Sequence, residues 1–528
     1  MLNKIKNLEN EFTVGKAAFI IGVFTLLSKL VALFRDPLIL SRIGVGDTTD
    51  IYFSAFRIPD FIFQLLVLGT LSVAFIPVFT EWLITDKDKA YRVANSILNA
   101  ALLGMGLVCV ILLIFSAPLT KLLVPGFSGE KLIRTIQLTR LFLLSPLIFT
   151  ASSVFTSILS SYKKFLMLSL APILYNLGII AGLFFLYPRF GLTGLGIGVI
   201  VGAFLHMSVQ IPEVLRYGFR WQGVLDWRDA SVRKIAKLFL PRVIGLDISQ
   251  VSLIIGTTVG SILAAGSVTI FNAANNLQTV PLGVFALSVS QASFPLLSEY
   301  FAKGDQKAFL QTLSDNIIQV MFFIVPVAIL MIMFRWYLVQ IIYGHGKFTD
   351  ADIVSLALTF GIMTVGLFGQ SLSPLFSRSF YAMHNTIIPV AVNVSSIILN
   401  AGLTYFLGRH YGLPGIATAF AFICVYDSVL MAIFLRLHLS KGQVPFGPTD
   451  SLVASSMLKI LLASAGMAVI GWVMIYLINI VGSPVGFVDT LVKSGIAVLI
   501  SAITFVTLAN YLKLNQAKQL LAILGKIF

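Results

Sequence analysis

Four charged side chains lie within or beside the first two apolar segments of the chain. Lys29, Arg35 and Asp36 belong to the first segment, and Arg57 precedes Pro59 in the second. An ionised side chain at the centre of a bilayer costs about 3 kcal/mol or more, so it should face a wet cavity or a charged partner. Lysine and arginine donors in such a cavity suit phosphate or diphosphate. The pattern predicts a site for an anionic substrate.

Ion pairing within this group is the alternative. Arg35 and Asp36 are neighbours, and Asp36 lies two helical turns after Lys29 on the same face. Lys29 is too deep in its segment to reach water easily, since Arg42 is about 20 Å away at roughly 1.5 Å per residue. We therefore expect Lys29 and Arg35 to line a water-filled cavity, with Arg57 assisting from a bend at Pro59.

No catalytic motif emerges from the remaining reactive side chains. The five histidines are scattered, and none has the spacing of metal ligands. Cys109 and Cys424 lie in apolar runs in different halves of the chain, which predicts core packing rather than a disulfide or a metal site. The sequence argues against an enzyme.

The composition indicates that the chain folds in a bilayer. Of its 528 residues, 58% are hydrophobic and 11% are charged, and the mean hydropathy is +0.95. Apolar runs of about 20 residues or more recur throughout, each long enough to cross a membrane as a helix. The basic residues that give the net charge of +15 are not clustered on one face among exposed aromatic residues, so no nucleic-acid partner is expected. Their distribution instead predicts the topology of the loops.

An all-α polytopic membrane protein of about fourteen transmembrane helices follows. An even number of helices puts both termini on one side, and the excess of Lys and Arg on that side predicts that both are cytoplasmic. The expected helices are 17–45, 51–83, 93–124, 133–160, 165–187, 191–218, 233–264, 267–302, 309–343, 352–382, 385–408, 411–438, 454–480 and 486–512.

The chain also contains an internal repeat. Three pairs of segments match in order and at nearly constant separation. They are AFIPVFTEW (74–82) with ASFPLLSEY (292–300), APILYN (171–176) with IPVAVN (388–393), and GLTGLG (191–196) with GLPGIA (412–417). Helices 1–6 and 7–12 are therefore expected to be two copies of one unit, inserted in parallel because six is even.

This repeat predicts three regions: an N-lobe over 1–225, a C-lobe over 226–445, and two extra helices with a cytoplasmic C-terminus over 446–528. Two lobes of like orientation around a membrane-normal axis are typical of alternating-access transporters, with the substrate between the lobes. A duplicated scaffold without transport is the alternative, and the intramembrane charges argue against it.

Several segments resemble the MurJ (MviN) lipid II flippases of the MOP superfamily. They are FRDPLILSRIGVGDTTDIYFSAFRIPDF (34–61), LGTLSVAFIPVFTEW (68–82), APILYNLGII (171–180), VPLGVFALSVSQASFPLLSEY (280–300) and SRSFYAMHNTIIPV (377–390). The resemblance implies fourteen helices, a cationic cavity between two lobes, and a groove of helices 13 and 14 for an undecaprenyl tail. It also implies the substrate, lipid II, and a bacterial inner membrane.

By the same resemblance, the family's cavity charges fall on Lys29, Arg35, Asp50 and Arg57. Other positions depart from the family pattern: Phe63 and Gln64 replace a pair of arginines and Leu68 a Glu, while Asn275 and Asn276 replace Asp-Arg, leaving Asn276 as a candidate substrate contact. A related lipid-linked oligosaccharide or amphiphile is therefore an alternative substrate.

The resemblance also suggests how transport is driven. Asp247, Asn393 and Thr418 match a sodium site inferred for some family members, and oxygen ligands suit a hard cation. Pairing of Asp247 with Arg242 is the alternative, with membrane potential or protons as the driver. No further cofactor is expected, and the expected partners are the undecaprenyl-linked glycan lipid, membrane lipids and the cell-wall synthesis machinery, for a monomer.

Two other classes of protein remain open. A drug or polysaccharide exporter of the same superfamily would share the repeat, but it would more often have twelve helices and lack the 34–61 block. A membrane glycosyltransferase would need a large non-cytoplasmic loop with paired carboxylates. The longest such loop here, around 343–352, is short.

Overall fold

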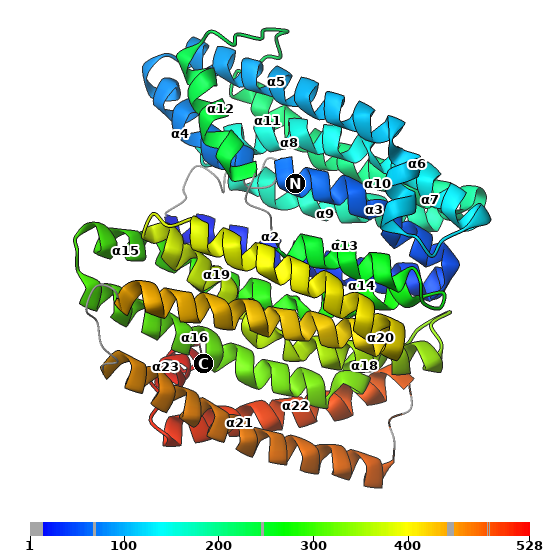
Figure 1. Ribbon diagram of the computed structural model, residues 1–528, viewed down its shortest axis with the longest axis vertical. Coiled ribbons are helices and arrows are strands. Elements are labelled where there is room, and N and C mark those ends of the chain that lie inside the picture. Colours follow the sequence, from blue (N-terminus) through cyan, green and yellow to red (C-terminus); the bar gives the residue numbers. More distant parts are fainter. Residues whose placement is uncertain are drawn as a thin grey trace. The chain divides into compact units, whose positions relative to one another are not determined.

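The computed structural model describes residues 14–66, 70–243, 248–440, 448–482, 484 and 486–527. Within these ranges every regular element is a helix (Figure 1), as predicted. The chain divides into two compact units, Met1–Leu246 and Asp247–Phe528. The boundary falls in the middle of the segment expected to form helix 7.

The N-terminal unit is built from eleven α-helices and one short π-helical segment in its described residues. They are α2 (Val14–Ile43), α3 (Asp47–Leu66), α4 (Thr70–Thr85), α5 (Lys87–Ile114), α6 (Ser116–Leu123), α7 (Gly129–Phe142), α8 (Leu144–Ser161), α9 (Phe165–Ala181), η1 (Gly182–Leu186), α10 (Tyr187–Ser208), α11 (Ile211–Arg216) and α12 (Ala230–Val243). Its main core lies among α4, α5, α8 and the chain around α12, where Phe75, Phe79 and Ile158 are fully buried.

The C-terminal unit repeats this arrangement and adds two long helices. Its elements are α13 (Ile248–Gly260), α14 (Ser267–Gln278), η2 (Leu282–Ala286), α15 (Leu287–Ala302), α16 (Gln306–Met333), α17 (Arg335–Tyr343), α18 (Asp350–Val365), α19 (Leu367–Ala382), α20 (Ile387–Ser440), α21 (Pro448–Val481), α22 (Gly486–Tyr511) and α23 (Asn515–Ile527). Figure 1 shows the long helices of this unit running alongside one another.

Most expected helices coincide with helices in the structure, but several are divided into two. The expected 93–124 is α5 and α6, and the expected 133–160 is α7 and α8. Pro118 and Pro146 lie in the first turns of α6 and α8, where a residue without an N–H group favours the start of a new helix. The expected 233–264 is likewise two helices, and α12 packs on α4 of the N-terminal unit.

Membrane-crossing length supports the polytopic assignment. Among the described residues, eight helical stretches are long and apolar enough to span a bilayer, or nine if α18 and α19, bent by 40°, form one span. Phe165–Arg216 has 52 residues and Ile387–Leu439 has 53, each too long for one crossing of about 20 residues. These stretches are compatible with fourteen transmembrane helices.

The internal repeat is also visible in the backbone conformation. Gly191 (φ 56°, ψ −141°) and Gly412 (φ 63°, ψ −142°) adopt the same non-helical conformation at the break inside each of these long stretches. Lys163 and His384, separated by the same number of residues, both have φ 57° and both follow a helix whose end is closed by equivalent backbone hydrogen bonds. Two chain segments with matching strained positions fold alike, so the repeat is structural.

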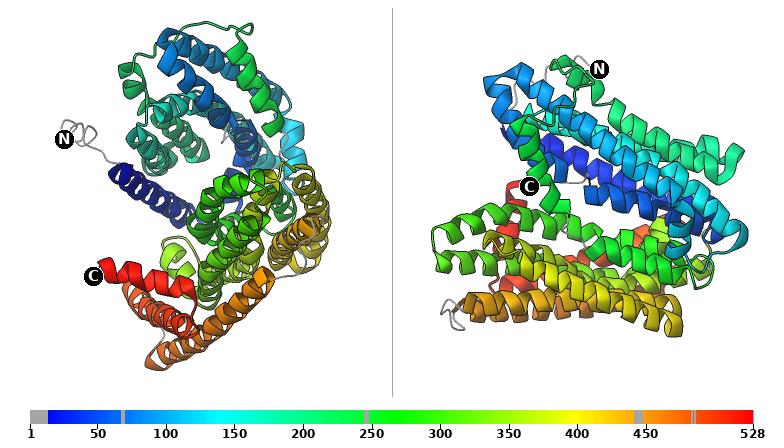
Figure 2. Two further views of the ribbon diagram at one scale, coloured as in Figure 1. Left: turned by 90° about the vertical axis from the view of Figure 1, so that its left-hand side faces the viewer. Right: turned by 45° about the horizontal axis from the view of Figure 1, so that its top comes forward.

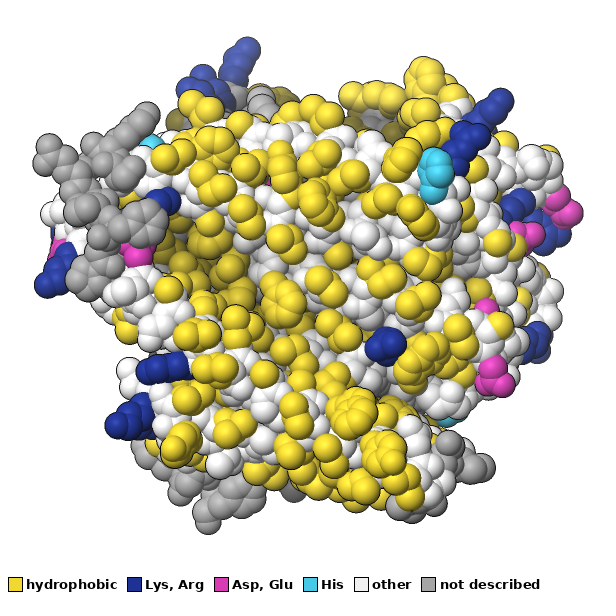
Figure 3. Space-filling model, turned by 60° about the horizontal axis from the view of Figure 1, so that its bottom comes forward, with side chains coloured by type: hydrophobic (Ala, Val, Ile, Leu, Met, Phe, Trp, Pro, Cys, Tyr) yellow, Lys and Arg dark blue, Asp and Glu magenta, His cyan; other side chains and the backbone are white. Residues whose placement is uncertain are grey.

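The two added helices pack on the C-terminal unit through two apolar clusters, the larger of which is centred on α16. Met321 and Phe322 of α16 contact Ile460 and Met467 of α21 and Phe505 of α22. Figures 1 and 2 show α21 and α22 at one edge of this unit. Their outward side chains remain exposed and apolar, among them Leu458, Leu461, Leu462, Val469, Trp472, Tyr476, Val488, Val492, Leu499 and Ile503. Figure 3 shows a molecular face whose middle is hydrophobic, with charged side chains mostly toward its ends, as a lipid-facing surface requires.

Candidate functional site in the N-terminal unit

Arg35 connects α2 to α9 through its guanidinium group. Its Nε donates to Asp36 Oδ1 over 2.8 Å, and its Nη1 donates to Asn176 Oδ1 over 3.1 Å. The Asn176 amide nitrogen in turn donates to the Pro172 carbonyl over 2.9 Å. The side chain of Arg35 is 22% exposed and that of Asp36 is 4% exposed. The guanidinium is thus oriented by two helices, while part of the Arg35 side chain remains accessible.

Close packing of α9 on α10 fixes the position of Asn176. A Cβ atom on Gly178 would lie 2.3 Å from the Cα of Gly202, and one on Gly182 would lie 2.5 Å from the Cα of Gly198. Glycines four residues apart on both helices let the two backbones approach this closely. The helix that carries Asn176 is therefore held rigidly against its neighbour.

α3 brings a second charged pair to the same region. Arg57 and Asp60 interact electrostatically with each other, and Asp60 also interacts with Arg35. Tyr52 of α3 and Tyr175 of α9 interact with Arg35 in the same way. The predicted charges Arg35, Asp36 and Arg57 are therefore part of one cluster formed by α2, α3 and α9, which we call the Arg35 cluster.

Asp60 is a member of this cluster that the sequence reasoning did not select. The signal was present, since Arg57 and Asp60 are three residues apart and so share one face of α3. With Asp60 included, two arginines and two aspartates cancel in formal charge. Lys29, which is exposed on α2, is a further predicted cation outside this balance.

Asp50 has a different setting from the Arg35 cluster. It lies in the first turn of α3, where Lys131 of α7 is 3.4 Å from its Oδ2 and 2.6 Å from Oδ1 of Asp47. Asp50 is almost fully buried, whereas the side chain of Asp47 is 63% exposed. These ion pairs tie the starts of α3 and α7 together, and a substrate contact at Asp50 stays a prediction.

The remaining predicted residues belong to the C-terminal unit. Asn276 is half-buried on α14, and Asn393 is half-buried on α20. Thr418 is exposed, and its hydroxyl donates to the Pro414 carbonyl of its own helix over 2.8 Å. Asp247 and its alternative partner Arg242 have side chains outside the described part of the structure. The sodium site therefore stays a prediction.

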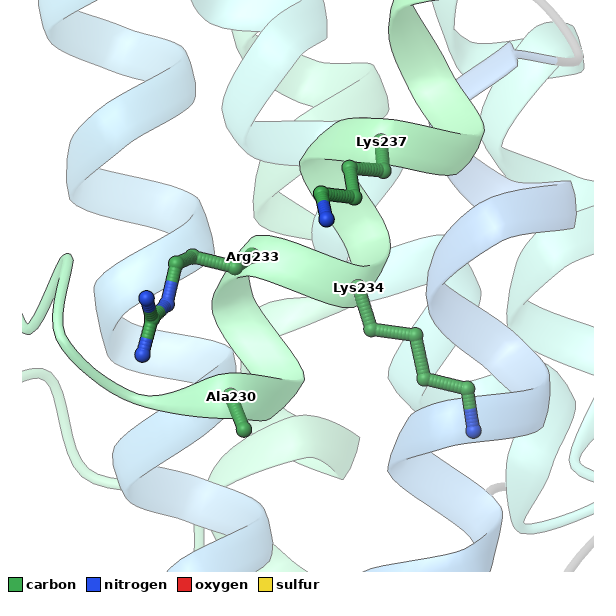
Figure 4. A pocket seen from close by; sticks show the side chains of 4 residues that line it. All are labelled: Ala230, Arg233, Lys234 and Lys237. Carbon is green, nitrogen blue, oxygen red and sulfur yellow. The ribbon is translucent and has the colours of Figure 1, made fainter.

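A basic surface lies on α12, in the segment that the sequence places on the cytoplasmic side. Ala230, Arg233, Lys234 and Lys237 line a depression of ≈ 410 Å³. Figure 4 shows the three basic side chains extending away from the helix backbone. Lys234 Nζ lies 3.5 Å from Glu81 of α4, an exposed pair that leaves the surface cationic.

Comparison with known families identifies the family of this chain. The model of the family described as lipid II flippase MurJ matches residues 39–494. The chain is a member of the MurJ family. A probable lipid II flippase MurJ of Borreliella burgdorferi is 27% identical over 410 residues, covering 78% of this chain and 80% of that protein. One of Vibrio cholerae serotype O1 is 26% identical over 447 residues, covering 82% and 85%.

Solved structures agree with the MurJ fold. A lipid II flippase MurJ in an inward closed conformation has a TM-score of 0.76 at 24% identity and covers 94% of this chain and 100% of that one. An inward-facing multidrug resistance MATE family transporter of the MOP superfamily has a TM-score of 0.65 at 15% identity, covering 80% and 98%. The chain therefore has the fold of these transporters. Its membership of the MurJ family and its apolar helices indicate a multi-pass protein of the inner membrane.

One departure from the expected MurJ pattern has a clear structural setting. Phe63 occupies a position where the resemblance predicts arginine, and its ring lies 5.0 Å from that of Phe149 of α8, centroid to centroid. Met105 and Cys109 complete this apolar contact. At this half-buried position, packing takes the place of the charge that the resemblance predicts.

Proposed function

We propose that this protein is a flippase that moves lipid II, the diphosphate-linked peptidoglycan precursor, from the cytoplasmic to the outer leaflet. The match of the MurJ family model to residues 39–494 carries the proposal. A transporter also suits the chemistry, because a diphosphate crossing the bilayer centre needs fixed donors to replace water. The proposed role is transport rather than enzymatic catalysis.

The Arg35 cluster is the proposed headgroup contact. Arg35 has five N–H groups, and its hydrogen bonds to described residues occupy Nε and Nη1. A diphosphate oxygen that reached this guanidinium would compete with the Asp36 carboxylate for it. Asn176 would hold the guanidinium in place during the exchange.

Lys29 and the basic surface of α12 would act before this step. Lys29 is exposed on the same helix as Arg35, six residues earlier, which is about 9 Å along the axis. Arg233, Lys234 and Lys237 would raise the local concentration of anionic headgroups on the cytoplasmic side, where both termini are proposed to lie. The undecaprenyl tail would stay in lipid against α21 and α22.

Alternating access of the two units would expose the headgroup site to each side in turn. The units are copies of one fold, which supports a rocking motion about an axis along the membrane normal. We further propose that the protein acts as a monomer. It would receive its substrate from the cell-wall synthesis machinery and deliver the translocated lipid to that machinery.

A second candidate substrate is another lipid-linked saccharide. The apolar packing of Phe63 and the neutral Asn276 remove cations that the family pattern predicts. A substrate with a different headgroup charge would fit such a cavity. The diphosphate contact at Arg35 would be the same in both cases.

Complementation distinguishes the two substrates. The protein should restore growth to bacteria depleted of their own lipid II flippase, and the purified protein should move fluorescent lipid II across liposomes. A well-expressed protein that fails in both assays but moves another undecaprenyl-linked glycan would identify that glycan as the substrate. Arg35→Gln should abolish transport of either one.

A further inference from the structure

Asp427 is a carboxylate buried within the C-terminal unit, in the second half of α20. Only 2% of the residue is exposed. Ser373 of α19 donates to its Oδ2 over 2.6 Å, and Ser396 of the first half of α20 donates to its Oδ1 over 3.2 Å. Both serine hydroxyls are directed at the carboxylate as donors.

This carboxylate faces a small cavity. The cavity has a volume of ≈ 200 Å³, and Ser252, Gln370, Ser373 and Cys424 are among its polar lining residues together with Asp427. Gln370 accepts a 3.1 Å hydrogen bond from the amide nitrogen of Gln278. The cavity is large enough for several water molecules, and its polar lining supplies the partners that they need.

The amide oxygen of Gln278, whose nitrogen bonds Gln370, also lacks a hydrogen-bond partner among the described residues. This oxygen is buried. A buried amide oxygen without a partner costs about 1–3 kcal/mol, so a water molecule is its natural partner.

The internal repeat places a second titratable residue at the equivalent position. The separation in sequence that relates Gly191 to Gly412 also relates His206 to Asp427. His206 Nδ1 lies 2.8 Å from the hydroxyl of Ser152. The histidine and its serine are 54 residues apart, as are Asp427 and Ser373.

Each unit therefore holds a titratable side chain against a serine at the same place in the fold. In the N-terminal unit, Gln210 donates to the same Ser152 hydroxyl over 2.7 Å and accepts from Thr156 over 2.9 Å, so that His206 ends a chain of polar groups. Aspartate and histidine differ in charge, size and preference for metals. The property that they share is a side chain that can gain or lose a proton.

We propose that Asp427 is a proton-binding site of the C-terminal unit and that its proton is taken up and released during the transport cycle. This proposal rests on the proposed flippase function for its coupling to transport, and on the geometry of the pocket for proton binding itself. In the ionised form, Ser373 and Ser396 donate to the carboxylate. In the protonated form, the carboxyl donates its own hydrogen to a serine oxygen or to cavity water, and the serine hydroxyls rotate.

A proton fits this pocket better than a metal ion. No group of three or more His, Cys, Asp and Glu side chains is gathered anywhere in the described residues. Sodium would need about six oxygen ligands by analogy with other hard cations, whereas the two serine hydroxyls bonded to Asp427 already point their hydrogens at it. His206 at the equivalent position is also a poor ligand for a hard cation.

The described helices that pack on α20 carry few ionisable groups. Cys424 lies one turn earlier on α20, lines the same cavity and interacts with Asp427 electrostatically. Of the helices that pack on α20, α19 carries Arg378, α18 carries Asp350 and Asp352 in its first turn, and the described α13 and α14 carry no charged residue. Arg378 is the charge on α19 that a variant should test.

Carbodiimide labelling tests proton binding without any lipid substrate. Dicyclohexylcarbodiimide reacts with protonated carboxyl groups in apolar surroundings, and peptide mass spectrometry locates the adduct. In the full-length protein in nanodiscs, labelling of Asp427 should fall by roughly tenfold between acidic and alkaline pH, and potassium in place of sodium should not change it. Asp450, which pairs with Arg436 over 2.8 Å, is the internal control and should label weakly.

Variants separate a proton site from a structural carboxylate. Ser373→Ala removes a donor to the ionised form, so labelling should persist to higher pH, whereas Arg378→Gln should leave the profile near that of the unmodified protein. Absence of labelling at every pH, labelling that sodium suppresses at constant pH, or an unchanged profile in Ser373→Ala would each overturn the proposal.

Transport provides the second measurement. In proteoliposomes with an imposed pH gradient, the rate of lipid II movement should respond to the gradient in the unmodified protein and not in Asp427→Asn. An Asp427→Asn variant that responds like the unmodified protein contradicts the coupling role. If the unmodified protein moves no lipid II while Asp427 still labels with pH, the proposed substrate has failed and the proton site stands.

Discussion

Arg35 Nη1 lies 3.1 Å from Asn176 Oδ1, a hydrogen bond between two helices that are 141 residues apart in sequence. The same guanidinium pairs with Asp36 on its own helix. A planar donor group held from two directions presents its remaining N–H groups in a fixed geometry, which a flexible ammonium group does not do. The role of Arg35 can therefore be tested with substitutions that change the shape of its side chain as well as with those that change its charge.

Arg35→Lys should reduce transport even though it keeps the charge. Lysine cannot bond Asp36 and Asn176 through a rigid fork, and the loss of one charge-assisted hydrogen bond, worth about 1.5–3 kcal/mol, predicts a decrease of about tenfold or more. Asn176→Ala should cost less, because Asp36 still orients the guanidinium. Initial rates of lipid II movement in proteoliposomes measure both.

Arg134→Lys is the matched control for that substitution. Arg134 forms an exposed pair with Glu130, so exchange for lysine should leave transport and expression unchanged. Equal activity of Arg35→Lys and Arg134→Lys would mean that Arg35 acts only as a charge.

Lys29 should depend on charge more than on shape. It is exposed on α2, where no hydrogen bond from it to another described residue fixes its position. Lys29→Arg should therefore retain transport, whereas Lys29→Met, similar in size but neutral, should abolish it at normal expression. A cysteine placed at 29 should react with a water-soluble thiol reagent. Normal transport by Lys29→Met would show that this cation is not part of the substrate path.

Much of the fold was predictable because hydrophobic length and repetition are properties of the chain itself. The all-α class and the repeat of GLTGLG and GLPGIA are confirmed, and Gly191 and Gly412 share one backbone conformation. The breaks between α5 and α6 and between α7 and α8 were missed, because an apolar run reports burial in lipid and says little about a short interruption of the helix.

The site was harder to predict, because its contacts join residues far apart in sequence. Arg35, Asp36 and Arg57 were selected because they are charges in apolar segments, and their role as a substrate site stays a prediction. The partnership of Arg35 with Asn176 needs the packing of α2 on α9. Asp60 was visible in FRIPDF and was overlooked. The serine partners of His206 and Asp427 could not be identified without the fold, since each pair is 54 residues apart.

Substitution of the glycines between α9 and α10 should destabilise the N-terminal unit. A Cβ on Gly182 would meet the Cα of Gly198 at 2.5 Å, and backbone atoms cannot move away as a flexible side chain can. Gly182→Val should therefore lower the thermal midpoint of the purified protein. Overpacking of this kind decreases the free energy of unfolding by about 1–3 kcal/mol. Gly104→Ala on α5, where nothing lies within 4 Å of the added Cβ, is the control and should have no such effect. A Gly182→Val protein as stable as the control would contradict the close contact.

Ion replacement distinguishes the two proposed drivers of transport. The sodium prediction invokes Asp247, Asn393 and Thr418, but the Thr418 hydroxyl already donates to the Pro414 carbonyl over 2.8 Å, as helix-bound threonines do. If the proton site at Asp427 drives transport, potassium in place of sodium should leave the rate unchanged, and Thr418→Val and Asp247→Asn should keep their response to a pH gradient. Proteoliposome rates in the two salts, with and without the gradient, measure this. A rate that requires sodium and loses that requirement in Asp247→Asn would instead place the coupling ion at the site inferred from the family, and Asp427 would then be a structural carboxylate that anchors α19 to both halves of α20.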